Sequence, residues 1–355
     1  MSGNFVQRGE PAVFDKFTRA KAALLNGADL VIELPVFAAA ESAFRFASYA
    51  ALLLKKIGVS HICFGTETEN LDELLKIVSL RDNEEFNRTL RRYLNAGHGY
   101  TNAVMRTQND FGIPRELYKP NNILAVEYLY ALRNTGVIPV NVPRKESSYN
   151  DGELSGSLSS ATSVRAALRR GDFSGAAKTL PENTLDIYVN SHIYNYDDMS
   201  LLLHYILKTA AKDEIRRISG VREGLENRII SASENSFAIS SIIADIQTKR
   251  YNFARVGRTL LHIILGIKEE DVAVFVKYAR YIQVLGFRKD SSCVLKEIEK
   301  SGLPIITNLK NAKKVLSEAD MYFFDKNNEC SDLYHICAGQ SVRKNTDYYK
   351  TIAII

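Results

Sequence analysis

The sequence predicts an α/β fold: a Rossmann-like parallel sheet in the first half, followed by a mainly helical second half. Up to about residue 180, short apolar runs typical of buried strands alternate with stretches that have helical apolar spacing. The strand-like runs are apolar throughout, which favours parallel strands covered on both faces. Helical spacing then dominates from residue 201 to residue 299. We therefore expect two domains, residues 1–188 and residues 189–355.

The elements of the first half follow in order along the chain. The expected strands are residues 28–35, 59–64 and 137–142, and the expected helices are residues 14–26, 42–56, 72–86, 87–95 and 121–133. In the second half, only residues 304–307 and 321–324 have strand-like composition, so a small terminal α/β element is expected there. Residues 1–11 predict a loop before the first helix, and no strand precedes them. A parallel α/β domain normally opens with a strand whose following turn holds the ligand, and that unit is missing here.

Composition excludes several classes of protein. The chain has 355 residues, 46% apolar and 25% charged, with a formal charge of +5, all ordinary for a water-soluble protein. Cys63, Cys293, Cys330 and Cys337 form no CxxC pair and have no zinc-ligand spacing, so a reducing compartment is expected. No apolar run reaches the roughly twenty residues of a membrane span, and the first ten residues are polar. We expect a cytoplasmic protein. The sequence contains neither a P-loop nor a GxSxG motif.

A turn rich in hydroxyl groups precedes an amphipathic helix at residues 159–170. Ser160, Thr162 and Ser163 lie where the first turn of that helix leaves N–H groups unpaired and carries partial positive charge. With Arg165 one turn further, the segment predicts a phosphate-binding pocket. The alternative is an ordinary serine or threonine N-cap followed by a surface arginine.

Three more candidates lie at the carboxyl ends of expected strands, where ligands bind in open α/β sheets. Gly65 follows the second strand and lets a ligand approach the backbone. Asn121 or Asn122, after the rigid Pro120, presents an amide at the start of a helix, and Arg144 follows the third strand. A turn glycine, a helix cap and a solvated arginine are the alternatives. The shared location favours a single site.

The helical half contains one segment without acidic residues, residues 248–258, that suits RNA. It carries Lys249, Arg250, Arg255 and Arg258 together with Tyr251 and Phe253. Cations that contact phosphates and aromatics that stack on bases are typical of RNA-binding surfaces. The alternative is a solvated helix face whose aromatics point into the core.

These residues give the chain a resemblance to the bacterial tRNA(Met) cytidine acetate ligase family, which has a nucleotidylyltransferase-like domain followed by a helical domain. The resemblance runs nearly end to end. It rests on residues 1–12 (MSGNFVQRGEPA), 27–35 (GADLVIELP), 64–67 (FGTE), 119–124 (KPNNIL), 160–165 (SATSVR), 223–228 (EGLENR) and 248–251 (TKRY).

The resemblance implies an ATP-dependent reaction in two steps. Acetate attacks the α-phosphate of ATP to give acetyl-adenylate and pyrophosphate, and N4 of the wobble cytidine in elongator tRNA(Met) then takes the acetyl group. Gly65, Asn121 and Arg144 match positions that contact ATP in the family, and the segment from Ser160 to Arg165 matches its second phosphate motif. The segment from Lys249 to Arg258 matches the tRNA-binding domain. Magnesium is expected to accompany ATP, with no tightly bound metal.

Two departures from the family are visible. Relatives have Tyr-His-Asp where this chain has Tyr149-Asn150-Asp151, and they begin with a strand and a turn that carries the paired-histidine HxGH motif. This chain starts just after that unit, so either the start codon was assigned too late or adenylation was lost; we favour the first. The chain as given is expected to have little or no activity. Two alternatives remain: a small-molecule adenylyltransferase, and a non-catalytic nucleotide- or RNA-binding remnant.

Overall fold

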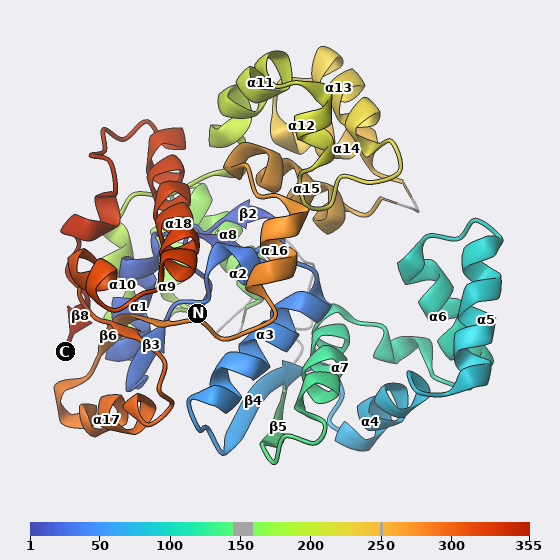
Figure 1. The fold of residues 1–355 in the computed structure, drawn as a ribbon, viewed down its shortest axis with the longest axis horizontal. Coiled ribbons are helices and arrows are strands. Elements are labelled where there is room, and N and C mark those ends of the chain that lie inside the picture. The colour runs from blue at the N-terminus through green and yellow to red at the C-terminus, as the bar shows by residue number, and fades with distance from the viewer. Residues whose placement is uncertain (145–158, 249–250) are drawn as a thin grey trace.

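The computed structural model describes residues 1–144, 159–248 and 251–355 and has the predicted α/β architecture, with parallel strand pairing (Figure 1). The helices before residue 190 are α1 (Lys16–Leu25), α2 (Val36–Ala39), α3 (Ala43–Lys56), α4 (Leu71–Leu80), α5 (Glu84–Asn95), α6 (Tyr100–Asp110), α7 (Pro120–Leu132), α8 (Ala161–Arg169), α9 (Phe173–Ala177) and α10 (Glu182–Val189). The later ones are α11 (Ser200–Thr209), α12 (Lys212–Arg216), α13 (Leu225–Asn235), α14 (Ile239–Ile246), α15 (Phe253–Leu265), α16 (Glu269–Phe275), α17 (Cys293–Glu299) and α18 (Glu318–Cys337).

The described strands form separate small sheets instead of one continuous sheet. β4 (His61–Thr66) and β5 (Ile138–Pro143) pair in parallel. Ile62 and Phe64 on β4 pack with apolar residues of α3, α4 and α7, which explains why this strand forms beside those helices. His61, Cys63 and Gly65 on the other face of β4 are exposed. The expectation that both faces are covered is therefore wrong for β4 among the described residues, because a short apolar run does not reveal which face is buried.

The first expected strand has a different partner from the one predicted. β3 (Leu30–Ile32) pairs antiparallel with β6 (Ile282–Phe287), and β7 (Ile305–Ile306) and β8 (Ala353–Ile354) both pair parallel with β6. We predicted only helical structure around β6. A continuous buried apolar run of that length fits a strand or a helix equally well, and the sequence does not name its partner.

A second wrong prediction concerns residues 321–324, which lie inside α18 and not in a strand. The aromatic run resembles a strand locally. Ser317, whose Oγ accepts a hydrogen bond from the Asp320 N–H at 3.1 Å, caps a long helix instead. The strand predicted at residues 304–307 is confirmed as β7.

The two proposed domains share their largest hydrophobic cluster. Phe37 of α2 stacks on Phe275 of α16 with ring centroids 5.1 Å apart, and lies edge-on to Phe323 of α18 at 5.2 Å. Helices α11 to α15 lie together at the top of Figure 1.

None of the helices in the described ranges is long and apolar enough to cross a membrane.

A buried ion pair ties the beginning of the chain to its end. The Lys16 ammonium on α1 lies 2.6 Å from Glu33 and 2.7 Å from Asp347, and all three side chains are fully buried. Burial alone would lower the pKa of Lys16, but the charges of Asp347 and Glu33 raise it above its ordinary value. Lys16 therefore stays charged, and it fixes α1 against β3 and the C-terminal segment.

The variant Lys16→Met should lose about 3–5 kcal/mol of stability, because it leaves buried carboxylates without their counter-charge. Urea unfolding measures the loss. Lys300→Met is the control, since the Lys300 ammonium pairs with Glu297 on an exposed helix surface and such pairs contribute less than about 1 kcal/mol. Equal stability of the two variants would contradict the role of the buried pair.

Candidate functional site

The structure brings Gly65, Asn121 and Arg144 together at the carboxyl end of the parallel strand pair. Arg144 directly follows β5, and its backbone N–H donates to the Thr66 carbonyl at 2.7 Å. Its guanidinium donates to the Asn121 side-chain oxygen at 3.1 Å. A Cβ added to Gly65 would lie 3.6 Å from the Arg144 side chain, an ordinary contact distance, so Gly65 and Arg144 are close neighbours.

Glu67, which sequence patterns alone did not single out, organises the start of α7. One carboxylate oxygen accepts from the Asn121 backbone N–H at 3.1 Å and from its side-chain amide at 2.7 Å. The other accepts from the Asn122 backbone N–H at 2.7 Å, and the Glu67 N–H donates to the Asn122 side-chain oxygen at 2.8 Å. A carboxylate at this position satisfies unpaired N–H groups and complements the helix dipole. Local sequence gives no sign of this pairing, because the residues are far apart in the chain.

The turn rich in hydroxyl groups begins a helix, as predicted. The Ser160 hydroxyl caps α8 by accepting from the Ser163 N–H at 3.0 Å. Thr162 is exposed, and its hydroxyl accepts a hydrogen bond from the Arg165 guanidinium at 3.2 Å. The cap interpretation is therefore correct for Ser160, and it is compatible with an anion site at the same helix N-terminus.

Positive charge concentrates around Arg165. Burial, and then the charges of Arg8, Arg169 and Arg144, lower the pKa of Arg165, while Glu10 opposes them. Arg144 is therefore near enough to Arg165 for their charges to interact, although it lies on a different segment. Arg169 is paired with Glu10 at 3.4 Å. The strand-end residues and the α8 turn thus share one electropositive region.

Of the residues predicted to bind tRNA, Lys249 and Arg250 lie outside the described residues, as do residues 149–151. Arg255 and Arg258 are on α15. The Arg255 guanidinium lies 4.9 Å from the Tyr251 ring centroid and 3.9 Å from Glu223, and Arg258 donates to the Gln7 carbonyl at 3.3 Å. Tyr251 is buried, as the alternative interpretation expected, whereas Phe253 is 40% exposed.

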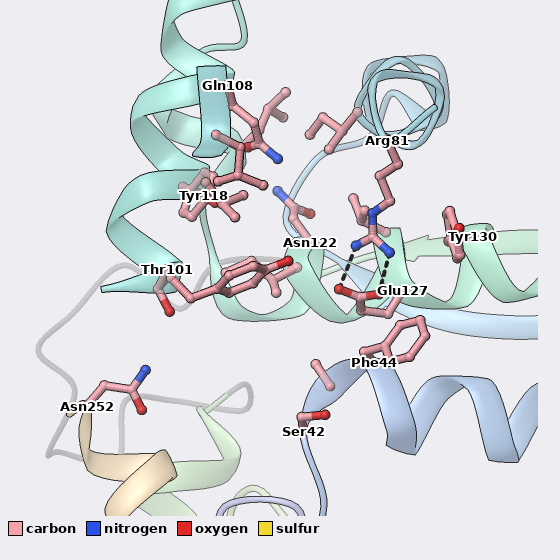
Figure 2. A pocket seen from close by; sticks show the side chains of 18 of the residues that line it. Ser42, Phe44, Arg81, Thr101, Gln108, Tyr118, Asn122, Glu127, Tyr130 and Asn252 are labelled. Atoms are coloured by element: carbon pink, nitrogen blue, oxygen red, sulfur yellow. Dashed lines mark hydrogen bonds and ion pairs between the residues drawn. The ribbon is translucent and has the colours of Figure 1, made fainter. Parts of the chain in front are cut away.

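A cavity of about 670 Å³ adjoins this region, and the sequence did not predict it. Residues of α4, α5, α6 and α7 line it, and Ser42 and Asn252 line it at the starts of α3 and α15 (Figure 2). Arg255 and Arg258 of α15 also line it. Arg81 and Glu127 form a bidentate ion pair in its wall, at 2.8 Å and 2.6 Å. Asn122, the neighbour of Asn121, also lines it. The cavity therefore joins the end of the parallel strand pair to the basic helix α15.

The chain is similar to known proteins along nearly its whole length. The family model described as HIGH Nucleotidyl Transferase matches residues 1–348. A tRNA(Met) cytidine acetate ligase from a Thermoanaerobacter species is 36% identical over 98% of this chain and 89% of its own length. The ligase of the same name from Acetivibrio thermocellus is 33% identical over 97% of this chain and 90% of its own length.

Solved crystal structures are also similar to this chain over its full length. The apo crystal structure of Thermotoga maritima TmcAL has a TM-score of 0.91 and 27% identity, and the match covers all of this chain and 91% of that one. The same protein bound with alpha-thio ATP has a TM-score of 0.89. The chain therefore belongs to the tRNA(Met) cytidine acetate ligase family of enzymes, within the HIGH nucleotidyl transferases.

Proposed function

We propose that the chain activates acetate with ATP and transfers the acetyl group to N4 of the wobble cytidine in elongator tRNA(Met). Residues 1–188 would bind ATP, and residues 189–355 would supply most of the tRNA-binding surface. The names of the relatives and the ATP analogue bound to Thermotoga maritima TmcAL support this proposal. The strongest support within this chain is the hydrogen bond from Arg144 to Asn121 beside Gly65.

In this proposal the triphosphate of ATP lies between Arg144 and the N-terminus of α8. Ser160 and Ser163 form the helix cap with each other, so the exposed Thr162 hydroxyl and the remaining first-turn N–H groups are the donors there, and the Arg165 guanidinium adds positive charge. The Asn121 amide binds the base or ribose, and Gly65 lets the nucleotide approach the backbone. The pKa of Arg165 is lowered first by burial and then by the charges of neighbouring arginines, and a bound phosphate would relieve that repulsion.

The first step forms a bond between a carboxylate oxygen of acetate and the α-phosphorus of ATP. The bond from the α-phosphorus to the bridging oxygen of pyrophosphate breaks, and negative charge grows on that oxygen. Cations positioned before the reaction lower this barrier. In the second step the N4 amine attacks the acetyl carbonyl carbon, AMP leaves with the electrons of the broken C–O bond, and the amine releases a proton.

Magnesium would arrive with ATP. Within residues 1–144, 159–248 and 251–355, no group of three or more His, Cys, Asp or Glu side chains could hold an ion. Nucleotide-bound Mg²⁺ is coordinated largely by phosphates and water. The chemistry proposed here assigns no step to the ion.

We also propose that Lys249, Arg250, Arg255 and Arg258 contact tRNA phosphates. Arg255 and Arg258 line the cavity beside the proposed ATP site, so RNA bound to them would lie near the activated acetyl group.

The four cysteines are all unpaired thiols, which supports a location in the cytoplasm.

The variant Arg144→Ala should bind ATP at least about tenfold more weakly, because it removes a charge-assisted contact to phosphate and the partner of Asn121. Isothermal titration calorimetry measures the change. Arg170→Ala, an exposed arginine at the other end of α8, is the matched control and should keep the affinity of the unmodified chain.

A pyrophosphate assay separates the proposal from its alternatives. Little release is expected from the chain as given; release that requires acetate, however slow, supports the ligase, whereas ATP binding with no detectable release at any acetate concentration favours a non-catalytic remnant. Release that requires a mononucleotide instead of acetate favours a small-molecule adenylyltransferase. Unchanged ATP affinity in Arg144→Ala would remove the proposed nucleotide site itself.

The double variant Arg255→Ala with Arg258→Ala should weaken tRNA binding and flatten its salt dependence, by about 0.7 in the log–log slope for each phosphate that is no longer neutralised. Filter binding over a range of salt concentrations measures both quantities. Arg217→Ala is the control, since Arg217 lies in the helical half but pairs with Glu270 on the surface. An unchanged slope would rule out phosphate binding by α15.

A further inference from the structure

Six cations gather on two short segments of the C-terminal part, which are separated in sequence by α18. The segments are the 3₁₀ helix η4 (Leu309–Lys314) and the residues around a second 3₁₀ helix, η5 (Thr346–Tyr349). All six side chains are exposed, and together they are termed the C-terminal basic patch: Lys310, Lys313, Lys314, Arg343, Lys344 and Lys350. Within residues 1–144, 159–248 and 251–355, none of them forms an ion pair.

Other cations of the C-terminal part do have acidic partners. The pairs are Lys300–Glu297 at 2.7 Å, Lys326–Glu329 at 3.4 Å and Arg288–Asp290 at 2.7 Å. Residues 309–316 and 338–355 contain a single acid, Asp347, which is buried and paired with Lys16. The patch therefore keeps its full positive charge towards solvent, and a surface of one sign attracts a partner of the opposite sign.

The fold holds the lysines of η4 outward. Leu309 and Ala312 of η4 are buried. Because a 3₁₀ helix has three residues per turn, side chains three apart lie on one edge. Burial of the edge with Leu309 and Ala312 therefore turns Lys310 and Lys313 together towards solvent.

The second segment is fixed by a buried acid of α18. The Asp332 carboxylate accepts hydrogen bonds from the backbone N–H of Asn345 at 2.6 Å and of Thr346 at 2.7 Å. These bonds hold the start of η5 against α18. Arg343 and Lys344 directly precede this anchored turn, so their backbone is held in place as well.

Tyr349 joins the two segments into one surface. Its ring is 58% exposed, and the Lys310 ammonium lies over it at 5.1 Å from the centroid. The Arg343 guanidinium lies over the same ring at 5.4 Å. Both distances are within the range of a cation–π contact, which favours keeping the two charges side by side.

The place of the patch in the fold indicates which part of an RNA would reach it. Lys350 lies three residues before β8, and Figure 1 shows β8 on the opposite side of the molecule from α5 and α6. The latter helices line the cavity that adjoins the proposed ATP site. An RNA that contacts both regions must therefore extend well beyond the loop that carries the reacting base.

We propose that the C-terminal basic patch binds backbone phosphates of a double-helical arm of the tRNA, outside the anticodon arm and independently of base sequence. Proteins recognise double-helical RNA mostly through its phosphates, 2′-hydroxyls and shape, and clustered cations supply the phosphate contacts. This inference rests on the proposed function, which supplies the RNA.

The test compares intact elongator tRNA(Met) with a hairpin that contains only its anticodon arm. Filter binding with the unmodified chain should show at least about tenfold tighter binding of the intact tRNA. Its log–log salt dependence should be steeper by about 2, at roughly 0.7–0.9 for each added phosphate contact. ATP affinity is measured by calorimetry on the same preparation.

A triple variant removes half of the charge of the patch: Lys310→Gln, Lys313→Gln and Arg343→Gln. It should lose most of the preference for intact tRNA while its affinities for the hairpin and for ATP stay unchanged. The matched control changes three paired cations: Lys300→Gln, Lys326→Gln and Arg288→Gln. Both variants lower the net charge by the same amount, so a preference that survives only in the control identifies a local surface.

Three results would overturn the assignment of the patch. The unmodified chain could bind intact tRNA no more tightly than the hairpin, the preference could survive in the patch variant, or both triple variants could lose it equally. Vesicles of anionic phospholipid that bind the unmodified chain, in the absence of any preference for intact tRNA, would assign the patch to a membrane surface instead. If the hairpin and ATP bind but intact tRNA has no advantage, only this inference fails. If neither RNA binds, the proposed function fails with it.

Discussion

The carboxylate of Glu67 fixes the geometry on which both the proposed ATP site and the cavity depend. It accepts hydrogen bonds from the first turn of α7, and its own backbone N–H donates back to Asn122. The end of β4 and the start of α7 are thus joined by hydrogen bonds that each donates to the other. The Glu67 carboxylate also places a negative charge at the positive end of the α7 dipole. A rotation of α7 against β4 would break all of these hydrogen bonds, so the side chains of Asn121 and Asn122 keep their orientations.

In these orientations, the two adjacent asparagine side chains have different surroundings. The Asn121 side chain contacts Arg144 at the strand ends, whereas the Asn122 side chain lines the cavity between α6 and α7. The proposed ATP site and the cavity therefore share this first helical turn as a wall. The buried ion pair around Lys16 stabilises a different region, where α1, β3 and the C-terminal segment meet.

Sequence patterns predicted those features that depend on neighbouring residues. The helices α3 and α7, the strands β4 and β5 and the cap of α8 follow from apolar spacing, capping residues and proline. The pairing of β3 with β6 did not, because a buried apolar run does not specify its partner. Gly65, Asn121 and Arg144 were predicted through their shared position at strand ends. Glu67 and the cavity were not, since they depend on tertiary contacts.

The central claim is that one carboxylate orients both sites, and the variant Glu67→Gln tests it most directly. Its NH₂ group would face N–H donors of α7, so the first turn should shift. We expect ATP affinity and the thermal midpoint to fall together, in calorimetry and thermal unfolding on the same preparation. Glu84→Gln, an exposed acid in the first turn of α5, should change neither. Loss of one property with full retention of the other would contradict the account.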